Sequence, residues 1–310
     1  MGTIYRTMLC MLACACGAVV AVEAQEVPAS YQQVLSILGK QGDYDASVLK
    51  VNLPRNDLKV TVAGVSTPTP FGFGGWVAMT KGDGGMDVLM GDLVLTEDEV
   101  NPVMSALLDQ GLSVTALHNH FFWEQPRVFF MHVHGMGTPA ALANQLTPAL
   151  ALIGTASPKP RPAPPGSAMP PAARPPSLTT ATLARIAGHV GQQSGEVYKI
   201  TVGRDDLNVT EMGAIINARM GLNTWAAFVG TDATAAIAGD VAMLASEVTP
   251  VLQTLRHHGL DVVAIHHHMT GTQPTIFFLH YWGTGPAEKL ATGFRAALDQ
   301  LGKRAAPGRR

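Results

Sequence analysis

Residues 111–137 read "GLSVTALHNHFFWEQPRVFFMHVHGMG", and residues 259–285 read "GLDVVAIHHHMTGTQPTIFFLHYWGTG". The two stretches align without a gap at an offset of 148 residues, and 13 of the 27 positions are identical. The likeness continues upstream, where Gly91-Asp92 corresponds to Gly239-Asp240. Self-similarity over such a distance indicates that one structural unit has been duplicated. The sequence therefore predicts two tandem repeats.

The remaining composition places the boundaries around these repeats. Residues 157–177 contain nine prolines and no acidic residue, a composition typical of an extended linker that cannot form a packed core. With 310 residues, the chain is long enough for two units with cores of their own. The predicted order is a signal peptide (1–24), repeat 1 (25–155), a Pro-rich disordered linker (156–177), repeat 2 (178–302) and a basic tail (303–310).

The N-terminal segment has the pattern of a secretory signal peptide. Arg6 precedes an apolar run that is too short for a comfortable membrane span, and Val22-Glu23-Ala24 is an acceptable cleavage site. We expect a periplasmic or secreted protein with no transmembrane span in its mature form. Lipoprotein anchoring fits less well, because the residues before Cys14 and Cys16 do not form a lipobox. All three cysteines would leave with the signal, so no thiolate ligand or nucleophile is expected.

The charge of the chain argues against one class of partner. The formal net charge is -2 and only 14% of the residues are charged. Nucleic-acid binding normally requires a basic surface, and no such partner is expected here. A small molecule or a ligand of the cell envelope remains open, and the oligomeric state is left open as well.

Each copy shows the same series of elements. We expect strands at 57–65, 76–81 and 86–95, and a helix over 97–110 that begins near the Thr96-x-x-Glu99 capping pattern and ends at Gly111. Two further strands, 112–122 and 126–135, are expected to be joined by a short loop, and a last helix follows Thr138-Pro139. The predicted fold class is α+β: two repeats, each a mainly antiparallel sheet with two helices, packed as a pseudo-twofold pair.

Histidines recur at strand spacing in both copies. Side chains two residues apart on a strand point to the same face, so His118 and His120 face together, as do His132 and His134. If the two strands pair so that partner numbers sum to 252, the four imidazoles converge. The second copy has histidines at three of the four equivalent positions, His266, His268 and His280, and Trp282 at the fourth. The pattern predicts a three-histidine cluster in each repeat, with His134 as a fourth member in the first.

Three neutral imidazoles on adjacent strands can bind a transition metal ion and leave one coordination position open. Zn or Cu fits such a donor set best, and Fe is a further candidate. The leading interpretation is a metal-binding carrier or sensor, or a metal-dependent hydrolase, with the question of enzyme activity open. Glu124 is the candidate proton acceptor in repeat 1 only, since repeat 2 has Thr272 at that position. Asp92 and Asp240 either orient a ligating histidine or end a strand in a turn.

Two other interpretations of the same residues stay open. The histidines of a metal-free envelope module would line a pocket for a glycan or peptide, with Trp123, Tyr281 and Trp282 as stacking groups. Histidines retained after duplication as structural hydrogen-bonding groups would give the same pattern. The spacing from His118 to Glu124 also matches the first cupin motif, but the preceding helix does not belong in that jelly roll.

The motifs "ALHNHFF…QPRVFFMHVHGMG" and "AIHHHMTGTQPTIFFLHYWGTG" in an exported chain resemble the LppY/LpqO-like family of bacterial exported proteins. The resemblance covers both copies, over about residues 35–155 and 178–302. Its most specific part is the succession of His-x-His, Gln-Pro and Phe-Phe-x-His. The resemblance implies export and a two-repeat layout, and it implies no particular reaction.

Overall fold

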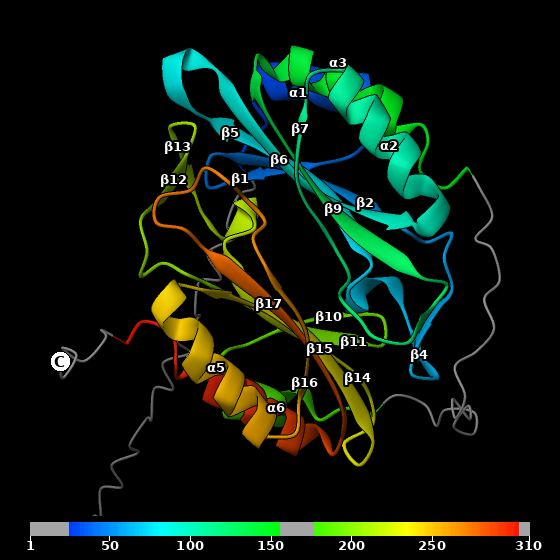
Figure 1. Cartoon of the computed structure of the whole chain (residues 1–310), viewed down its shortest axis with the longest axis vertical. Helices are drawn as coiled ribbons and strands as arrows, with labels where there is room; N and C mark the ends of the chain where they lie inside the picture. The colour runs from blue at the N-terminus through cyan, green and yellow to red at the C-terminus, as the bar shows by residue number, and fades with distance from the viewer. Residues whose placement is uncertain (1–24, 156–176, 304–310) are drawn as a thin grey trace, which may run out of the picture.

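The structure is a computed structural model, and it describes residues 25–155 and 177–303 (Figure 1). The expected signal peptide and almost all of the expected linker and basic tail lie outside the described residues. Within the part that is described, no helix is long and apolar enough to cross a membrane.

Repeat 1 is built on a six-stranded antiparallel sheet in the order β1-β2-β5-β6-β9-β7. These strands are β1 (Asp43–Asp45), β2 (Val48–Pro54), β5 (Gly74–Lys81), β6 (Asp87–Thr96), β7 (Ser113–His118) and β9 (Val128–Gly137). The helices are α1 (Ala29–Leu38), α2 (Glu97–Asp109) and α3 (Pro139–Leu150). A small second sheet contains β3 (Val60–Val62), β4 (Val65–Thr67) and β8 (Glu124–Gln125).

Repeat 2 has the same sheet order, β10-β11-β14-β15-β17-β16. Its strands are β10 (Gln192–Ser194), β11 (Val197–Gly203), β14 (Asn223–Gly230), β15 (Ala235–Met243), β16 (Asp261–His266) and β17 (Phe277–Gly285). Its helices are α4 (Thr180–Ala187), α5 (Ala245–His257) and α6 (Ala287–Leu298), and β12 (Val209–Glu211) with β13 (Ala214–Ile216) forms a separate hairpin. Short 3-10 turns occur at Thr69–Phe71, Asp83–Gly85 and Ala218–Met220.

The α+β prediction with two antiparallel repeats is confirmed, with one addition and one displaced segment. Each repeat has three helices rather than two, because a short helix, α1 or α4, precedes the first strand. The stretch expected as one strand at 57–65 instead turns at Ala63-Gly64, where both residues have positive φ, and forms the β3–β4 hairpin outside the main sheet.

The helix predicted over 97–110 is observed as α2, and Gly111 follows it with φ +79°. The Glu99 carboxylate accepts a hydrogen bond from the backbone N–H of Thr96 at 2.7 Å, which is the carboxylate half of the capping box. It also accepts hydrogen bonds from the guanidinium of Arg55 at 2.7 and 3.1 Å. Both charged side chains are buried, so the start of α2 is fixed to the segment between β2 and β3.

The predicted register of the two histidine strands is wrong. In the structure Ala116 pairs with His132 and His118 pairs with Phe130, so the partner numbers sum to 248 rather than 252. The connection is also longer than the predicted short loop, because β7 ends at His118 and β9 begins at Val128. Part of that connection, β8, pairs with β3 instead of continuing the hairpin. His134 consequently lies opposite Ser113, well away from His118.

The two sheets face each other, and the helices lie on the outer sides. Figure 1 shows α1, α2 and α3 above the first sheet and α5 and α6 below the second. Because the inner faces meet, β6 and β15 are buried along their whole length. Apolar side chains of both repeats pack together between the sheets, for example Phe71 and Phe121 of repeat 1 against Trp282 of repeat 2. This shared core fixes the two repeats as a pseudo-twofold pair.

Candidate functional site

The six histidines shared by the two copies lie in one place, between the inner faces of the sheets. The separate cluster predicted for each repeat is therefore replaced by a single shared cluster. His132 and His280 occupy equivalent positions in the central strands β9 and β17. His118 and His266 are the last residues of the edge strands β7 and β16, and His120 and His268 follow in the connections.

The three closest contacts between histidine rings each join one repeat to the other. The ring centroids of His118 and His266 are 3.6 Å apart, those of His120 and His280 are 3.7 Å apart, and those of His132 and His268 are 3.9 Å apart. Within repeat 1, the Nε2 atoms of His118 and His132 are 3.0 Å apart. The hydroxyl of Thr115 also donates a hydrogen bond to the carbonyl of His268 at 2.6 Å, which ties the edge strand of repeat 1 to the connection that holds His268.

The donor atoms of the cluster converge tightly enough for an ion. His118, His266, His268 and His280 each offer a ring nitrogen, and these four atoms all lie within 4.8 Å of one another. Several buried ring nitrogens have no hydrogen-bond partner among the described residues: His118 Nδ1, both nitrogens of His120, His266 Nε2, His268 Nε2 and both nitrogens of His280. Buried polar atoms are normally satisfied, and a coordinated cation would satisfy several of these at once.

Burial keeps the imidazoles neutral. It lowers the pKa of His266 to about 4 and lowers the pKa of His120, His132 and His268 well below the usual value, with a smaller contribution from the neighbouring histidines. A neutral imidazole has a lone pair free for coordination, whereas an imidazolium does not. The cluster therefore has the protonation state that a metal ligand requires at neutral pH.

Two carboxylates lie beside the cluster. Asp92 Oδ1 is 3.8 Å from His132 Nε2, and Asp240 lies 3.9 Å from both His268 Nε2 and His280 Nδ1. The turn interpretation of these residues is wrong, because both lie inside strands, β6 and β15, and cross-pair with the histidine strands. Burial raises the pKa of Asp92 to about 7 and raises the pKa of Asp240 well above its usual range. A cation at the histidines would reverse that effect by favouring the carboxylate form.

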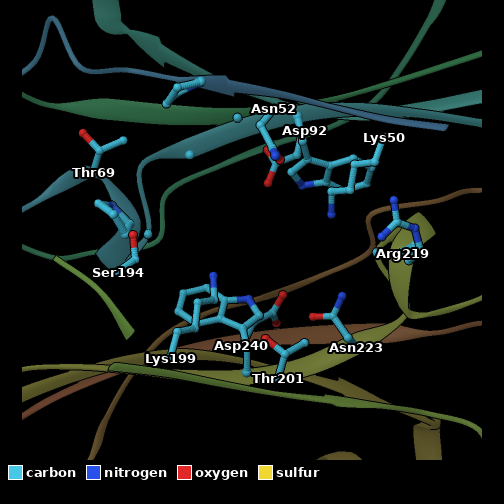
Figure 2. Close-up of a pocket in the computed structure, with 18 of the residues that line it drawn as sticks. Lys50, Asn52, Thr69, Asp92, Ser194, Lys199, Thr201, Arg219, Asn223 and Asp240 are labelled. Carbon is cyan, nitrogen blue, oxygen red and sulfur yellow. The ribbon is translucent and has the colours of Figure 1, made fainter. Parts of the chain in front are cut away.

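The cluster opens onto a cavity of about 770 Å³ between the repeats. His120, His132 and His268 line it together with Asp92 and Asp240. Equivalent residues of the two sheets also line the cavity: Lys50 and Lys199, Asn52 and Thr201, and Trp76 and Trp225, with Arg219 and Asn223 added from repeat 2. Figure 2 shows Lys50 and Asn52 facing Lys199 and Thr201 across the space. A volume in this range suits a small organic ligand.

Two of the predicted site residues lie outside this cluster. His134 is buried on β9, and its Nδ1 is 3.2 Å from Oε1 of Glu211 on β12, so it joins the repeats at another point. Glu124 is in β8, where its carboxylate lies 3.4 Å from Asn119 Nδ2 and 3.7 Å from Arg127 Nε. Neither residue lines the cavity.

The aromatic residues considered as stacking groups also lie elsewhere. Tyr281 and Trp282 are buried, the former against the outer helices and the latter in the core between the sheets. Trp123 is half exposed and lines a smaller, separate hollow with Phe122. The tryptophans of the main cavity, Trp76 and Trp225, were not predicted.

The lysines and tryptophans of the cavity could have been found from the duplication. Lys50 and Lys199, like Trp76 and Trp225, are separated by 149 residues, whereas the histidines are separated by 148. The change has a structural cause: residues 82–86 connect β5 to β6, but the shorter segment 231–234 connects β14 to β15. Extending the alignment upstream with this one-residue shift pairs all four residues.

This two-repeat architecture defines the class of protein. The chain belongs to the family described as Domain of Unknown Function (DUF1259), whose model matches residues 32–152 and 181–300, one match for each repeat. The match confirms an uncharacterised family with two tandem repeats. A search of curated proteins found no match.

Two solved structures show limited similarity. One is the trimeric bacterial microcompartment shell protein PduB, at 10% identity, with 84% of this chain and 93% of that chain covered and a TM-score of 0.20. The other is EtuB from Clostridium kluyveri, at 9% identity, with 84% and 91% covered and a TM-score of 0.20.

Proposed function

We propose that this chain is an exported protein that binds one transition metal ion in the shared histidine cluster. The observation that supports the proposal is the set of four imidazole nitrogens, one from repeat 1 and three from repeat 2, within 4.8 Å of one another. The ring nitrogens that lack partners and the neutral state of the imidazoles fit this donor set. His120 and His132 lie close enough to complete or orient it.

The chemistry of the donors limits the ion. Imidazole nitrogens without thiolates suit Zn²⁺ and Cu²⁺ best, and Fe²⁺ next, whereas Ca²⁺ and Mg²⁺ prefer all-oxygen sites. Asp92 and Asp240 lie behind the histidines at 3.8 and 3.9 Å, where carboxylates commonly orient ligating imidazoles.

The first test is the metal content of the untagged protein, residues 25–310, measured by elemental mass spectrometry. We expect about one equivalent of zinc, copper or iron, retained after dialysis. The variant His266→Ala/His268→Ala/His280→Ala should lose it. A matched control is His189→Ala/His257→Ala/His258→Ala, which removes three exposed histidines of the same repeat and should keep the metal.

Two results would overturn the proposal. One is a protein that contains no metal and takes up none on titration with zinc or copper. The other is a triple cluster variant that remains folded by circular dichroism and still holds its full equivalent.

A metal-dependent hydrolase is the second candidate, and the cavity beside the cluster favours it over a closed storage site. A bound metal with an open position makes water a better nucleophile at neutral pH. Asp92 and Asp240 line the cavity and lie nearest the histidines, so they replace Glu124 as the candidate proton acceptors. Turnover of p-nitrophenyl acetate by the zinc-loaded protein, abolished in the metal-free protein and strongly reduced in Asp240→Asn, would support this candidate. Equal rates in all three would contradict it.

Export and the LppY/LpqO-like relationship are part of the same proposal. They rest on the N-terminal pattern and on the histidine motifs of the sequence. Mass spectrometry of the protein recovered from the periplasm or the medium should give an N-terminus near Gln25. A protein that retains residues 1–24 and stays in the cytoplasm would contradict export.

A further inference from the structure

The wall of the cavity farther from the histidines has a chemistry that the metal site does not use. Lys50 of β2 and Lys199 of β11 line it from opposite repeats. Figure 2 shows both side chains directed into the space, one from each sheet. Each ammonium group lies over an indole ring: Lys50 Nζ is 4.5 Å from the ring centroid of Trp76, and Lys199 Nζ is 3.9 Å from that of Trp225.

The tryptophans fix the position of the two charges. A cation over the face of an indole ring is attracted by the ring quadrupole and loses some of its rotational freedom. The ion pairs found among the described residues include neither lysine. The ammonium groups of Lys50 and Lys199 are therefore held in a partly enclosed space, at equivalent positions of the two sheets. No carboxylate among the described residues forms an ion pair with either of them.

Burial lowers the pKa of both lysines to about 8, and the charge of Lys50 contributes to the effect on Lys199. Two like charges in a shared cavity are unfavourable unless a counter-charge enters. Asn52, Thr201 and Asn223, which line the same part of the wall, are neutral. Two carboxyls of the cavity, Asp92 and Asp240, partly offset the lysine charges, but they lie beside the histidines and form an ion pair with neither lysine among the described residues. The other cation of the wall, Arg219, already contacts Asp43.

We propose that the cavity binds a small organic dianion, either a dicarboxylate or a phosphate monoester, held between Lys50 and Lys199. The placement of this ligand beside the ion rests on the proposed metal site, but the lysine pair is independent of it. Asp92 and Asp240 lie deeper, beside the histidines, where a bound cation would offset their charge. A ligand of this kind would reach both the lysines and the ion.

Isothermal titration calorimetry on the full mature chain tests the inference with two probes that chelate metals weakly, succinate and glycerol 1-phosphate. The neutral analogues succinamide and glycerol are the matched ligands. We expect one of the two anions to bind and neither neutral analogue to bind. Which anion binds identifies the acidic group, carboxylate or phosphate, that the site prefers.

The variant Lys50→Gln/Lys199→Gln should weaken anion binding by on the order of 100-fold, because two charge-assisted contacts are lost. Its control is Lys40→Gln/Lys59→Gln, which removes the same charge from exposed positions and should leave the affinity within about twofold, as expected for distant surface charges. Single variants of either lysine should each show part of the effect.

Each titration is run on metal-loaded and on metal-free protein, and the metal content of the lysine variant is measured. Anion binding that depends on the lysines but not on the metal would uphold this inference even if the metal proposal failed. A protein that holds its metal but binds neither anion would overturn the inference and leave the metal proposal intact. Equal anion affinity in the lysine variant and its control would overturn it as well.

Discussion

The imidazole rings of His118 and His266 stack with their centroids 3.6 Å apart, although 148 residues separate them in the chain. They occupy the same position in the two repeats, at the ends of the edge strands β7 and β16. The pseudo-twofold axis therefore passes close to this contact. The duplication has therefore not produced a separate histidine cluster in each repeat. The two repeats pack so that their histidines form one cluster.

This arrangement predicts that removing one histidine affects all of the bound metal. In His118→Ala, we expect the affinity for zinc to fall by more than ~10–100-fold. That range is typical for mutating a residue that only hydrogen-bonds to a metal ligand, whereas His118 is proposed as a ligand itself. Two independent sites would behave differently, since the three histidines of repeat 2 would still hold half of the metal at full strength. Competition with a chelating dye, over a range of zinc concentrations, distinguishes the two cases.

The control for this measurement is His134→Gln. His134 is on the same strand as His132 and equally buried, but it contacts Glu211 and does not belong to the cluster. Its zinc affinity should equal that of the unchanged protein. Retention of half of the bound zinc at the original affinity in His118→Ala would rule out the shared site.

Much of the fold could be predicted from local pattern. The duplication, the helix from Glu97 to Asp109 and the strands that contain Gly91 and His132 depend on periodicity and on capping residues within a few positions of each other. Such signals are present in the sequence itself. The histidines were found for the same reason, since His-x-His spacing and its repetition are visible without a structure.

Two features could not be predicted from the sequence: the register of β7 against β9, and the joining of the histidines of both repeats into one cluster. Each depends on contacts with residues far away in the chain. The pairing of His118 with Phe130 follows from a connection in which Glu124-Gln125 pairs with β3. That pairing involves residues more than 60 positions upstream, so the local hairpin rules that set a register do not apply. The shared cluster depends on how two complete sheets pack, and hydrophobic patterning does not reveal which faces will meet.

The buried ion pair at the start of α5 should contribute strongly to stability. Glu247 accepts hydrogen bonds from Arg204 at 2.8 and 3.0 Å and from the backbone N–H groups of Leu244 and Gly302 at 2.8 and 2.7 Å. In Glu247→Ala the buried guanidinium keeps only the half-exposed Asp206 as a carboxylate partner, and the loss of the buried partner should lower the free energy of unfolding by about 3 kcal/mol. Urea denaturation measures the change.

An exposed ion pair in the same repeat provides the comparison. Arg256 and Asp261 are 2.6 Å apart, but about half of each side chain is exposed. In Asp261→Ala we expect a loss of less than about 1 kcal/mol, because water screens such pairs. Similar losses in the two variants would show that the buried network has no special importance.

A glycine in β15 should resist substitution. A Cβ at Gly239 would collide with the Tyr281 hydroxyl and with the carbonyl oxygen of Trp225, and this Tyr281 hydroxyl donates a hydrogen bond to the same carbonyl at 3.3 Å. Gly239→Ala should therefore destabilise the protein by about 1–3 kcal/mol, as overpacking usually does. At Gly74 nothing lies within 4 Å of an added Cβ, so Gly74→Ala is the control, and an equal effect there would contradict the packing argument.

The histidine cluster also predicts how the metal-free protein responds to acid. Burial lowers the pKa of His266 from 6.5 to about 4 and lowers the pKa of His120, His132 and His268 well below the usual value. Between pH 6.5 and 4 the unfolded chain protonates these imidazoles and the folded chain does not, so their contribution lowers the free energy of unfolding as the pH falls. The raised pKa values of Asp92 and Asp240 act in the opposite direction, but the histidines of the cluster outnumber these two carboxyls. Each histidine that stays neutral contributes a slope of up to ~1.4 kcal/mol per pH unit, whereas above pH 6.5 these groups add no dependence. Urea midpoints at pH 5.0, 6.0 and 7.5 measure this change in stability.

Replacing two histidines of the cluster, as in His268→Phe/His280→Phe, should flatten the slope, because fewer buried imidazoles remain neutral in the folded state. The exposed pair His257→Gln/His258→Gln should leave it unchanged. Zinc should raise the midpoint at pH 7.5 and do so less at pH 5.0, since protons compete for the same nitrogens. A midpoint that stays constant from pH 7.5 to 5.0 in the metal-free protein would mean that the imidazoles titrate as they do in the unfolded chain, and the buried neutral cluster would be excluded.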